Sequence, residues 1–204
     1  YRNFGYIDGH RYVLSQTGGS TGNGFVYSEK LFKKHGWKVP ETVDELYELV
    51  ETINNDPVNT DNDPNNDIAP FGWGGQVMAY WDTVVGMWWA QYEGEEYIAD
   101  FYKNPSPEKY QNREGLKKAL QVFENLICTG EGKPKNSMEG AMGKNHLLMQ
   151  NDFVQYKCAM LSGYYGIINE TASYIDPDCD LKVFFPAIEG AKTDENGNPI
   201  IINI

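Results

Sequence analysis

The sequence predicts an α/β fold, in which helices pack on a sheet, and three observations favour it. Short apolar segments typical of strands alternate with longer segments whose apolar residues recur at helical spacing. Residues that cap helices stand at the ends of several of the longer segments. Aromatic residues make up 14% of the 204 residues, and that density of apolar surface is typical of a folded domain rather than of a disordered chain.

The first predicted elements are two short strands and a capped helix. Residues 12–14 and 24–27 have the apolar character of strands, and turn residues fill the loop between them. Ser28 is expected to cap a short helix that continues to residue 35, because its hydroxyl can accept a backbone N–H of the first turn. Gly36 would end this helix in the left-handed conformation that glycine adopts readily.

The second predicted helix starts with a capping box. Thr42 stands at the N-cap and Glu45 at the third helical position, so each side chain can accept a backbone N–H at the helix start. Apolar residues then recur on one face and predict a buried stripe, made of Val43, Leu46, Leu49, Val50 and Ile53. Residues 54–70 are rich in Asn, Asp and Pro and are expected to form a loop.

A third helix is predicted over residues 77–92, with Gly94 as its end. Apolar and aromatic residues occupy almost all of its faces, so this helix must be largely buried or line a site. Trp88 and Trp89 lie deep in it and are expected to be core.

The remaining elements follow the same alternation. An amphipathic helix is predicted between an Asn112 cap and a Gly130 stop. After it we expect a weaker helix, two strands and a hairpin that leads into a last strand, over residues 138–150, 157–161, 181–188 and 196–204.

The charge balance excludes several classes of function. Lys and Arg number 17 against 29 Asp and Glu, a net charge of −12, so the basic footprint of a nucleic-acid binder is missing. No apolar run is long enough to span a bilayer. The cysteines and histidines have no metal-binding or disulfide spacing, and no metal site is predicted from Cys128, Cys158, Cys179, His10, His35 and His146.

A glycine-rich segment and two acidic segments are considered as possible phosphate, catalytic or calcium sites, and none is predicted to be one. The glycine-rich residues 18–24 lack the Lys-Ser/Thr pair of a phosphate loop. Acidic side chains at 93, 95 and 96 are expected to form a solvated face after the third helix. Oxygen ligands alternate as in a calcium loop at Asp61, Asp63, Asn65 and Asp67, but Gly72 stands where such a loop carries its bidentate Glu, so a solvated loop is the preferred interpretation.

The aromatic residues are the informative feature. Sugar recognition uses flat apolar rings against the C–H faces of a pyranose, with Asp, Asn or Gln for its hydroxyls. Tyr164 and Tyr165 are flanked by glycines at the turn after a predicted strand, where an exposed ring is favoured over a core position.

Four segments together resemble the extracellular solute-binding proteins of carbohydrate ABC importers. Residues 24–36, GFVYSEKLFKKHG, resemble the strand–helix unit of that family, and residues 39–46, VPETVDEL, resemble its adjoining helix start. Residues 159–165, AMLSGYY, resemble its strand before a site aromatic, and Phe185-Pro186 resembles the short strand with proline that follows. The order and the spacing of these segments agree with the family over most of the chain.

The resemblance implies one lobe of a two-lobed, periplasmic-binding-protein-like fold of type II. Residues 1–204 would be a single α/β lobe excised from a longer protein, with residues 1–14 and 185–204 near the crossovers between lobes. Such proteins bind a sugar or oligosaccharide in the cleft, perform no chemistry and use no cofactor. They deliver the ligand to membrane permease subunits, as lipoproteins on the extracellular face of the membrane or in the periplasm.

Positions carried over from the family give the candidate ligand-binding residues. Tyr165 would be the aromatic platform, with Tyr164 beside it, and Asn23 would be a polar contact before its strand. The start of the third helix would supply the remaining contacts, from Trp73, Gln76, Tyr80, Trp81 and Asp82.

Two other classes remain open from the sequence. A glycan-active enzyme domain, or a self-contained carbohydrate-binding module, would share the aromatic residues, but the enzyme needs two carboxylates in one cleft and only Asp82 with Glu93 offers such a pair. A lobe for peptides or amino acids would need an arginine for the ligand carboxylate. Neither Arg11 nor Arg113 falls in a candidate segment, which favours a neutral ligand.

Overall fold

The computed structural model describes residues 6–7, 10–11, 23–77, 79–111, 113–128, 135–164, 166–171 and 175–200. Its main sheet has the order β4-β5-β3-β6, and the two-stranded sheet β1-β2 stands apart from it. The strands are β1 (Tyr6–Ile7), β2 (His10–Arg11), β3 (Asn23–Ser28), β4 (Ala69–Gly72), β5 (Cys158–Tyr164) and β6 (Leu181–Phe184).

Strand direction brings distant segments to one edge of the main sheet. β4 and β5 are parallel, whereas β3 is antiparallel to both of its neighbours, β5 and β6. The carboxyl ends of β4, β5 and β6 therefore lie at the same edge as the amino end of β3. Asn23, the first residue of β3, is paired with Tyr164, the last residue of β5.

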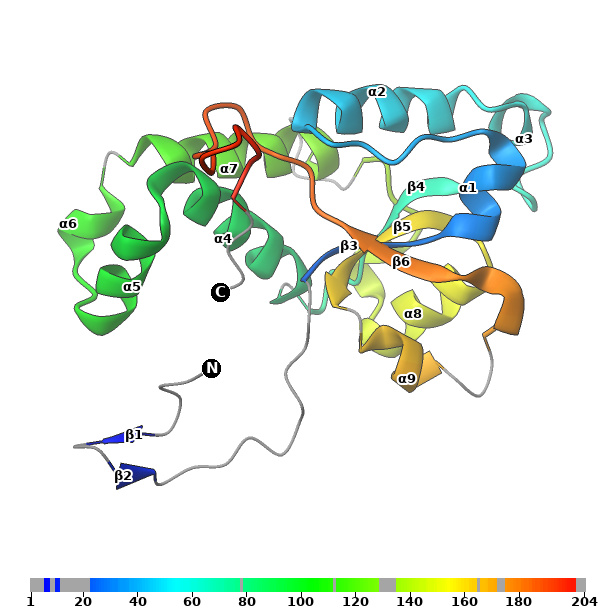
Figure 1. Cartoon of the computed structure of the whole chain (residues 1–204). Helices are drawn as coiled ribbons and strands as arrows, with labels where there is room; N and C mark the ends of the chain where they lie inside the picture. The colour runs from blue at the N-terminus through cyan, green and yellow to red at the C-terminus, as the bar shows by residue number, and fades with distance from the viewer. Residues whose placement is uncertain are drawn as a thin grey trace.

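Helices cover both faces of this sheet, so the predicted α/β layers are confirmed (Figure 1). Along β3, Phe25 and Tyr27 belong to the larger core, while Val26 between them belongs to the core on the opposite face. The helices are α1 (Glu29–His35), α2 (Val43–Asn54), α3 (Pro57–Thr60), α4 (Ala79–Glu93), α5 (Glu95–Lys103), α6 (Pro107–Tyr110), α7 (Glu114–Ile127), α8 (His146–Val154) and α9 (Ile167–Thr171), with short 3₁₀ turns η1 (Ala141–Gly143) and η2 (Pro177–Cys179).

The caps predicted for α1 and α2 are confirmed. The Ser28 hydroxyl accepts the backbone N–H of Leu31, and Gly36 ends α1 with a φ of 72°. The Thr42 hydroxyl accepts the N–H of Glu45 at 3.2 Å, and the Glu45 carboxylate accepts the N–H of Glu41 at 2.7 Å. The box therefore reaches back one residue beyond the N-cap.

The prediction of an unbroken loop over residues 54–70 is wrong. Asp56 caps α3 by accepting the N–H of Val58, Pro57 is its first residue, and β4 starts at Ala69. A proline at the first helical position has no N–H to leave unpaired, so a polar, proline-rich segment still forms a helical turn.

Several other boundaries also differ from prediction. The weaker helix expected at 138–150 is a 3₁₀ turn followed by α8, whose N-cap is Asn145. The acidic residues at 95 and 96 begin a further helix, α5, where the helix dipole favours negative charge. β6 ends at Phe184 rather than at residue 188. The strand expected at 12–14 and residues 201–204 lie outside the described residues.

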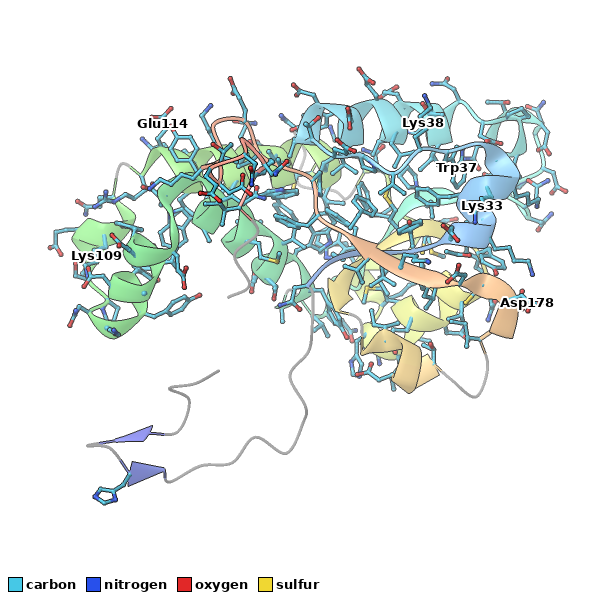
Figure 2. All side chains as sticks on the ribbon, in the orientation of Figure 1. Lys33, Trp37, Lys38, Lys109, Glu114 and Asp178 are labelled. Atoms are coloured by element: carbon cyan, nitrogen blue, oxygen red, sulfur yellow. The ribbon has the colours of Figure 1, made fainter. Side chains whose placement is uncertain are left out.

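Helices α5 and α6 project from the main body next to the start of α7, where Figure 2 shows Lys109 and Glu114. Lys109 holds this segment together, since its ammonium pairs with Asp100 and its carbonyl accepts the Tyr97 hydroxyl at 2.6 Å. The long interior of α4 is core as predicted: Trp88 is fully buried and donates its indole N–H to the carbonyl of Pro186 at 3.0 Å, and Trp89 is also buried.

Candidate functional site

A cavity of about 660 Å³ opens at the sheet edge where β5 ends and β3 begins. We call it the Tyr80 cavity. Its walls come from β3, the start of α4, the start of α8, the end of β5 and α9, through Asn23, Val77, Ala79, Tyr80, Thr83, His146, Leu147, Gly163 and Glu170.

The shape of the Tyr80 cavity depends on a missing side chain. A Cβ atom at Gly163 would lie 2.8 Å from Cδ1 of Ile167 and 3.1 Å from Cδ1 of Tyr80. Both distances are shorter than ordinary contacts between carbon atoms. Glycine at the end of β5 therefore lets the Tyr80 ring lie against the strand and form a wall of the cavity.

A buried amide connects three of the walls. The side chain of Gln150, on α8, is fully buried. Its Nε2 donates to Oε2 of Glu170 at 2.6 Å and approaches the Tyr80 hydroxyl at 3.4 Å. Burial, and secondarily the Glu170 charge, raise the pKa of Tyr80, so its phenol keeps its proton at neutral pH.

Of the sequence-predicted residues, the structure places Asn23 and Tyr80 on the Tyr80 cavity. Tyr164 lies at the same sheet edge, paired with Asn23. Tyr165 is outside the described residues.

The two tryptophans predicted as contacts are buried elsewhere. Trp81 is 1% exposed, with its ring 5.3 to 5.6 Å from those of Phe25, Phe71 and Phe123. Trp73 is buried and its ring lies 6.3 Å from that of Phe123. Successive residues of a helix point about 100° apart, so α4 can turn Tyr80 to the cavity and Trp81 to the core.

Gln76 and Asp82 are exposed, and neither lines the Tyr80 cavity. The position of Asp82 also argues against a catalytic pair with Glu93. Asp82 and Glu93 are eleven residues apart on α4, which is about 16 Å along the helix axis at 1.5 Å per residue. Carboxylates of glycoside hydrolases lie about 5 to 9.5 Å apart, so the structure does not support this pair.

Of the described residues that line the cavity, sequence reasoning named only Asn23 and Tyr80 as ligand contacts. Thr83 follows Tyr80 by three residues, and helical periodicity could have found it. His146, Leu147 and Glu170 come from α8 and α9 and had no local signal, because only the tertiary fold brings these helices to the start of α4.

The Asp/Asn loop before β4 uses its carboxylates within the loop. Oδ1 of Asp61 accepts the N–H of Asp63 at 2.8 Å, and Oδ1 of Asp63 accepts the side-chain amide of Asn65 at 2.7 Å. Among the residues that the structure describes, no three His, Cys, Asp or Glu side chains are grouped as ligands for a metal ion. In the same residues, no helix has the length and apolar character to cross a membrane.

The chain matches a known protein family over nearly its whole length. The sequence model of the family described as "Bacterial extracellular solute-binding protein" matches residues 4–204. A search of curated proteins found no significant match.

Solved structures give the same picture of the fold. The apo form of RafE from Streptococcus pneumoniae is 21% identical with a TM-score of 0.61, over 81% of this chain and 39% of RafE. A chitin oligosaccharide binding protein is 17% identical with a TM-score of 0.62, over 91% of this chain and 42% of its own. A structure described for xylan utilization by Caldanaerobius polysaccharolyticus is 22% identical with a TM-score of 0.60, over 83% and 40% of the two chains.

The chain thus spans about two fifths of the length of the solved structures that it matches. Likeness at this identity shows the fold. It agrees with the prediction of a single α/β lobe of a two-lobed protein.

Proposed function

Since the chain belongs to the family of bacterial extracellular solute-binding proteins, we propose that its Tyr80 cavity is the lobe's share of a binding site for a neutral sugar or oligosaccharide. The observation that carries the proposal is the mixed lining of this cavity. An aromatic ring and apolar side chains suit the C–H faces of a sugar, and Asn23, Thr83 and Glu170 suit its hydroxyls.

The absence of basic groups supports a neutral ligand. None of the described residues that line the Tyr80 cavity is Lys or Arg. Arg113 is engaged elsewhere, with its guanidinium 4.6 Å from the centre of the Tyr97 ring and its Nε donating to the Lys109 carbonyl at 3.1 Å. A ligand carboxylate would find neither Lys nor Arg to pair with among these described residues.

Similar structures support the same class of ligand. RafE has been solved in complex with raffinose, and a sugar transporter from Bacillus licheniformis in complex with stachyose.

By this proposal the chain works with a second lobe that closes over the ligand. The protein presents its sugar to the membrane permease of an ABC importer, outside the cell membrane or in the periplasm, and a lipid anchor outside this sequence holds it there. Binding requires no cofactor.

The test uses the full-length protein and a panel of neutral sugars that includes raffinose, stachyose and chitotriose. Binding of a sugar should raise the melting temperature, and titration calorimetry then gives its Kd. Tyr80→Ala should weaken binding by about 1–3 kcal/mol, because the ring supplies the apolar wall. Tyr102→Ala is the matched control, since this tyrosine is 64% exposed on α5 and does not line the cavity.

Two results would contradict the proposal: a wild-type protein that no sugar stabilises, or a Tyr80→Ala variant that binds as tightly as the Tyr102→Ala control. Tyr165→Ala, with Tyr164→Ala beside it, tests the aromatic platform expected from the family resemblance in the same assay.

A further inference from the structure

We propose that Gln150 is a positioning residue that holds the Glu170 carboxylate at the wall of the Tyr80 cavity, and that Glu170 makes the site reject sugars that carry a carboxylate. This inference rests on the proposed sugar site and names the residues that restrict its ligands.

The geometry of Gln150 indicates a role beyond packing. One amide nitrogen on α8 contacts a carboxylate on α9 and a phenol on α4, at 2.6 and 3.4 Å. Both of those groups line the Tyr80 cavity, whereas Gln150 itself is fully buried behind them. Its side chain can therefore fix the two groups without contacting the ligand.

The other end of the same amide is unsatisfied. Oε1 of Gln150 is buried and has no hydrogen-bond partner among the residues that the structure describes. Burying such an oxygen costs stability, and an apolar side chain of similar length would avoid the cost. The contacts made by Nε2 are thus the best physical reason for an amide at this position.

The charge of Glu170 then decides which sugars can enter. A hydroxyl of a neutral sugar can donate to the carboxylate, and a bond to a charged acceptor is stronger than one between neutral groups. The carboxylate of a uronic acid would instead meet a like charge, with no Lys or Arg among the described lining residues to compensate. His146 also lines the cavity, so all Kd values are measured at one fixed pH, pH 8.

The experiment measures discrimination in the full-length protein. The probes are matched pairs of a neutral sugar and its 6-carboxylate, galactose with galacturonate and glucose with glucuronate, each as the monosaccharide and as the 1,4-linked trisaccharide. The readout is the Kd of the carboxylate divided by the Kd of its neutral partner. The wild-type protein should prefer at least one neutral member by about tenfold or more, because like charges in a partly enclosed site repel strongly.

Variants separate the two parts of the inference. Glu170→Gln should lower the ratio to about threefold or less, since the repulsion is gone. Gln150→Met, which keeps the length of the side chain and removes its donor, should lower the ratio in the same direction. Gln91→Met is the matched control: Gln91 is also fully buried, but its amide oxygen accepts the N–H of Ile188, away from the cavity.

The possible results distinguish the role of Glu170, the role of Gln150 and sugar binding itself. A ratio unchanged in Glu170→Gln, or a wild-type preference for the carboxylates, overturns the inference while sugar binding itself still stands. A ratio that falls in Glu170→Gln but not in Gln150→Met, or that falls equally in Gln91→Met, overturns the positioning role. If the wild-type protein binds no sugar of either kind, the proposed function fails and this inference fails with it.

Discussion

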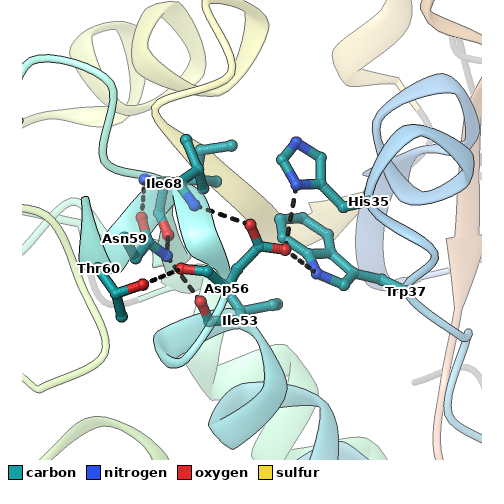
Figure 3. A network of polar contacts seen from close by, with 8 residues as sticks. His35, Trp37, Ile53, Asp56, Asn59, Thr60 and Ile68 are labelled. Carbon is teal, nitrogen blue, oxygen red and sulfur yellow. Dashed lines mark hydrogen bonds and ion pairs between the residues drawn. The ribbon is translucent and has the colours of Figure 1, made fainter.

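Two networks in this lobe each hold a carboxylate, and they differ in what the carboxylate faces. Asp56, 9% exposed, accepts from Nδ1 of His35 at 3.1 Å, from the indole N–H of Trp37 at 3.0 Å and from the N–H of Val58 at 3.0 Å (Figure 3). Glu170 is exposed, accepts from Gln150 and lines the Tyr80 cavity.

This difference indicates that the Asp56 carboxylate stabilises the fold, whereas the Glu170 carboxylate can bind a ligand. The donors to Asp56 come from the end of α1, the segment after it and the start of α3, so one carboxylate joins three parts of the chain. Its acceptor capacity is used inside the protein. Glu170 is exposed and lines a cavity, so its removal should change ligand binding more than stability.

The largest expected effect is on folding, from Asp56→Ala. The change leaves the Trp37 indole, the His35 ring and the Val58 amide without their acceptor. Breaking a buried pair in this way costs about 3–5 kcal/mol, and we expect that loss in the free energy of unfolding. Urea unfolding of the full-length protein measures it.

Asp61→Ala is the control for Asp56→Ala, because Asp61 is an exposed aspartate of the neighbouring loop. It should cost about 1 kcal/mol or less. The folded fraction of Asp56→Ala should bind sugar as the wild type does. Equal losses of stability in the two variants would show that the Asp56 network contributes little to the fold.

A smaller effect on the free energy of unfolding is expected from protonation of the Asp56 carboxylate at low pH. Burial by itself would raise the pKa of Asp56, but the hydrogen bonds from Val58 and His35, together with that from Trp37, outweigh it and lower the pKa below its ordinary value. A carboxylate with a lowered pKa in the folded state stabilises the protein above its unfolded pKa, near 3.9, and loses that effect as the pH falls through the folded pKa.

The variant for this test is Asp56→Asn, which does not titrate. At pH 7 it should be about 1–2 kcal/mol less stable than the wild type, since a neutral acceptor is weaker than a charged one. The gap between the two should close as the pH falls below the unfolded pKa of about 3.9 and through the lower pKa of the folded state. Urea unfolding at a series of pH values measures the gap, and a constant gap would mean that the Asp56 charge does not stabilise the fold.

Much of the fold could be predicted because its signals are local. Ser28 and Thr42 cap helices through contacts within three residues, and the predictions there were confirmed. The missed turn α3 also has local signals, Asp56 at its N-cap and Pro57 at its first position. The surrounding Asn and Asp residues made a continuous loop the more natural interpretation.

The candidate site was less predictable because it depends on orientation and on distant segments. Tyr80 and Trp81 are neighbours on a helix that is aromatic on almost every face, so no amphipathic contrast showed which ring turns to the core. Glu170 and Gln150 meet only when α8 and α9 pack together, and no spacing in the sequence records that contact.

Gly163→Ala should change the shape of the Tyr80 cavity and lower both stability and sugar affinity, by less than the loss expected from Asp56→Ala. The added methyl group would press on Ile167 and on the Tyr80 ring, which must shift. We expect stability to fall by about 1 kcal/mol, as overpacking does. Sugar affinity should fall about tenfold, or about 1.4 kcal/mol, in titration calorimetry.

Gly143→Ala is the matched control for this change. Gly143 lies in η1, three residues before His146 of the cavity wall, and a Cβ there would have no heavy atom within 4 Å. The control should bind as the wild type does. If both alanine variants bind equally well, the position of the Tyr80 ring does not shape the site.

The smallest expected effect completes the comparison of the two carboxylates. Glu170→Gln should change the free energy of unfolding by about 0.5 kcal/mol or less, because the side chain is exposed and an amide oxygen can still accept from Gln150. The same exchange of carboxylate for amide at Asp56 should cost several times more, since three donors there depend on one buried acceptor. Urea unfolding of both variants at pH 7 gives the two values side by side. If Glu170→Gln costs as much as Asp56→Asn, Glu170 belongs to the scaffold of the lobe, and its place on the cavity wall is a consequence of packing rather than a provision for a ligand.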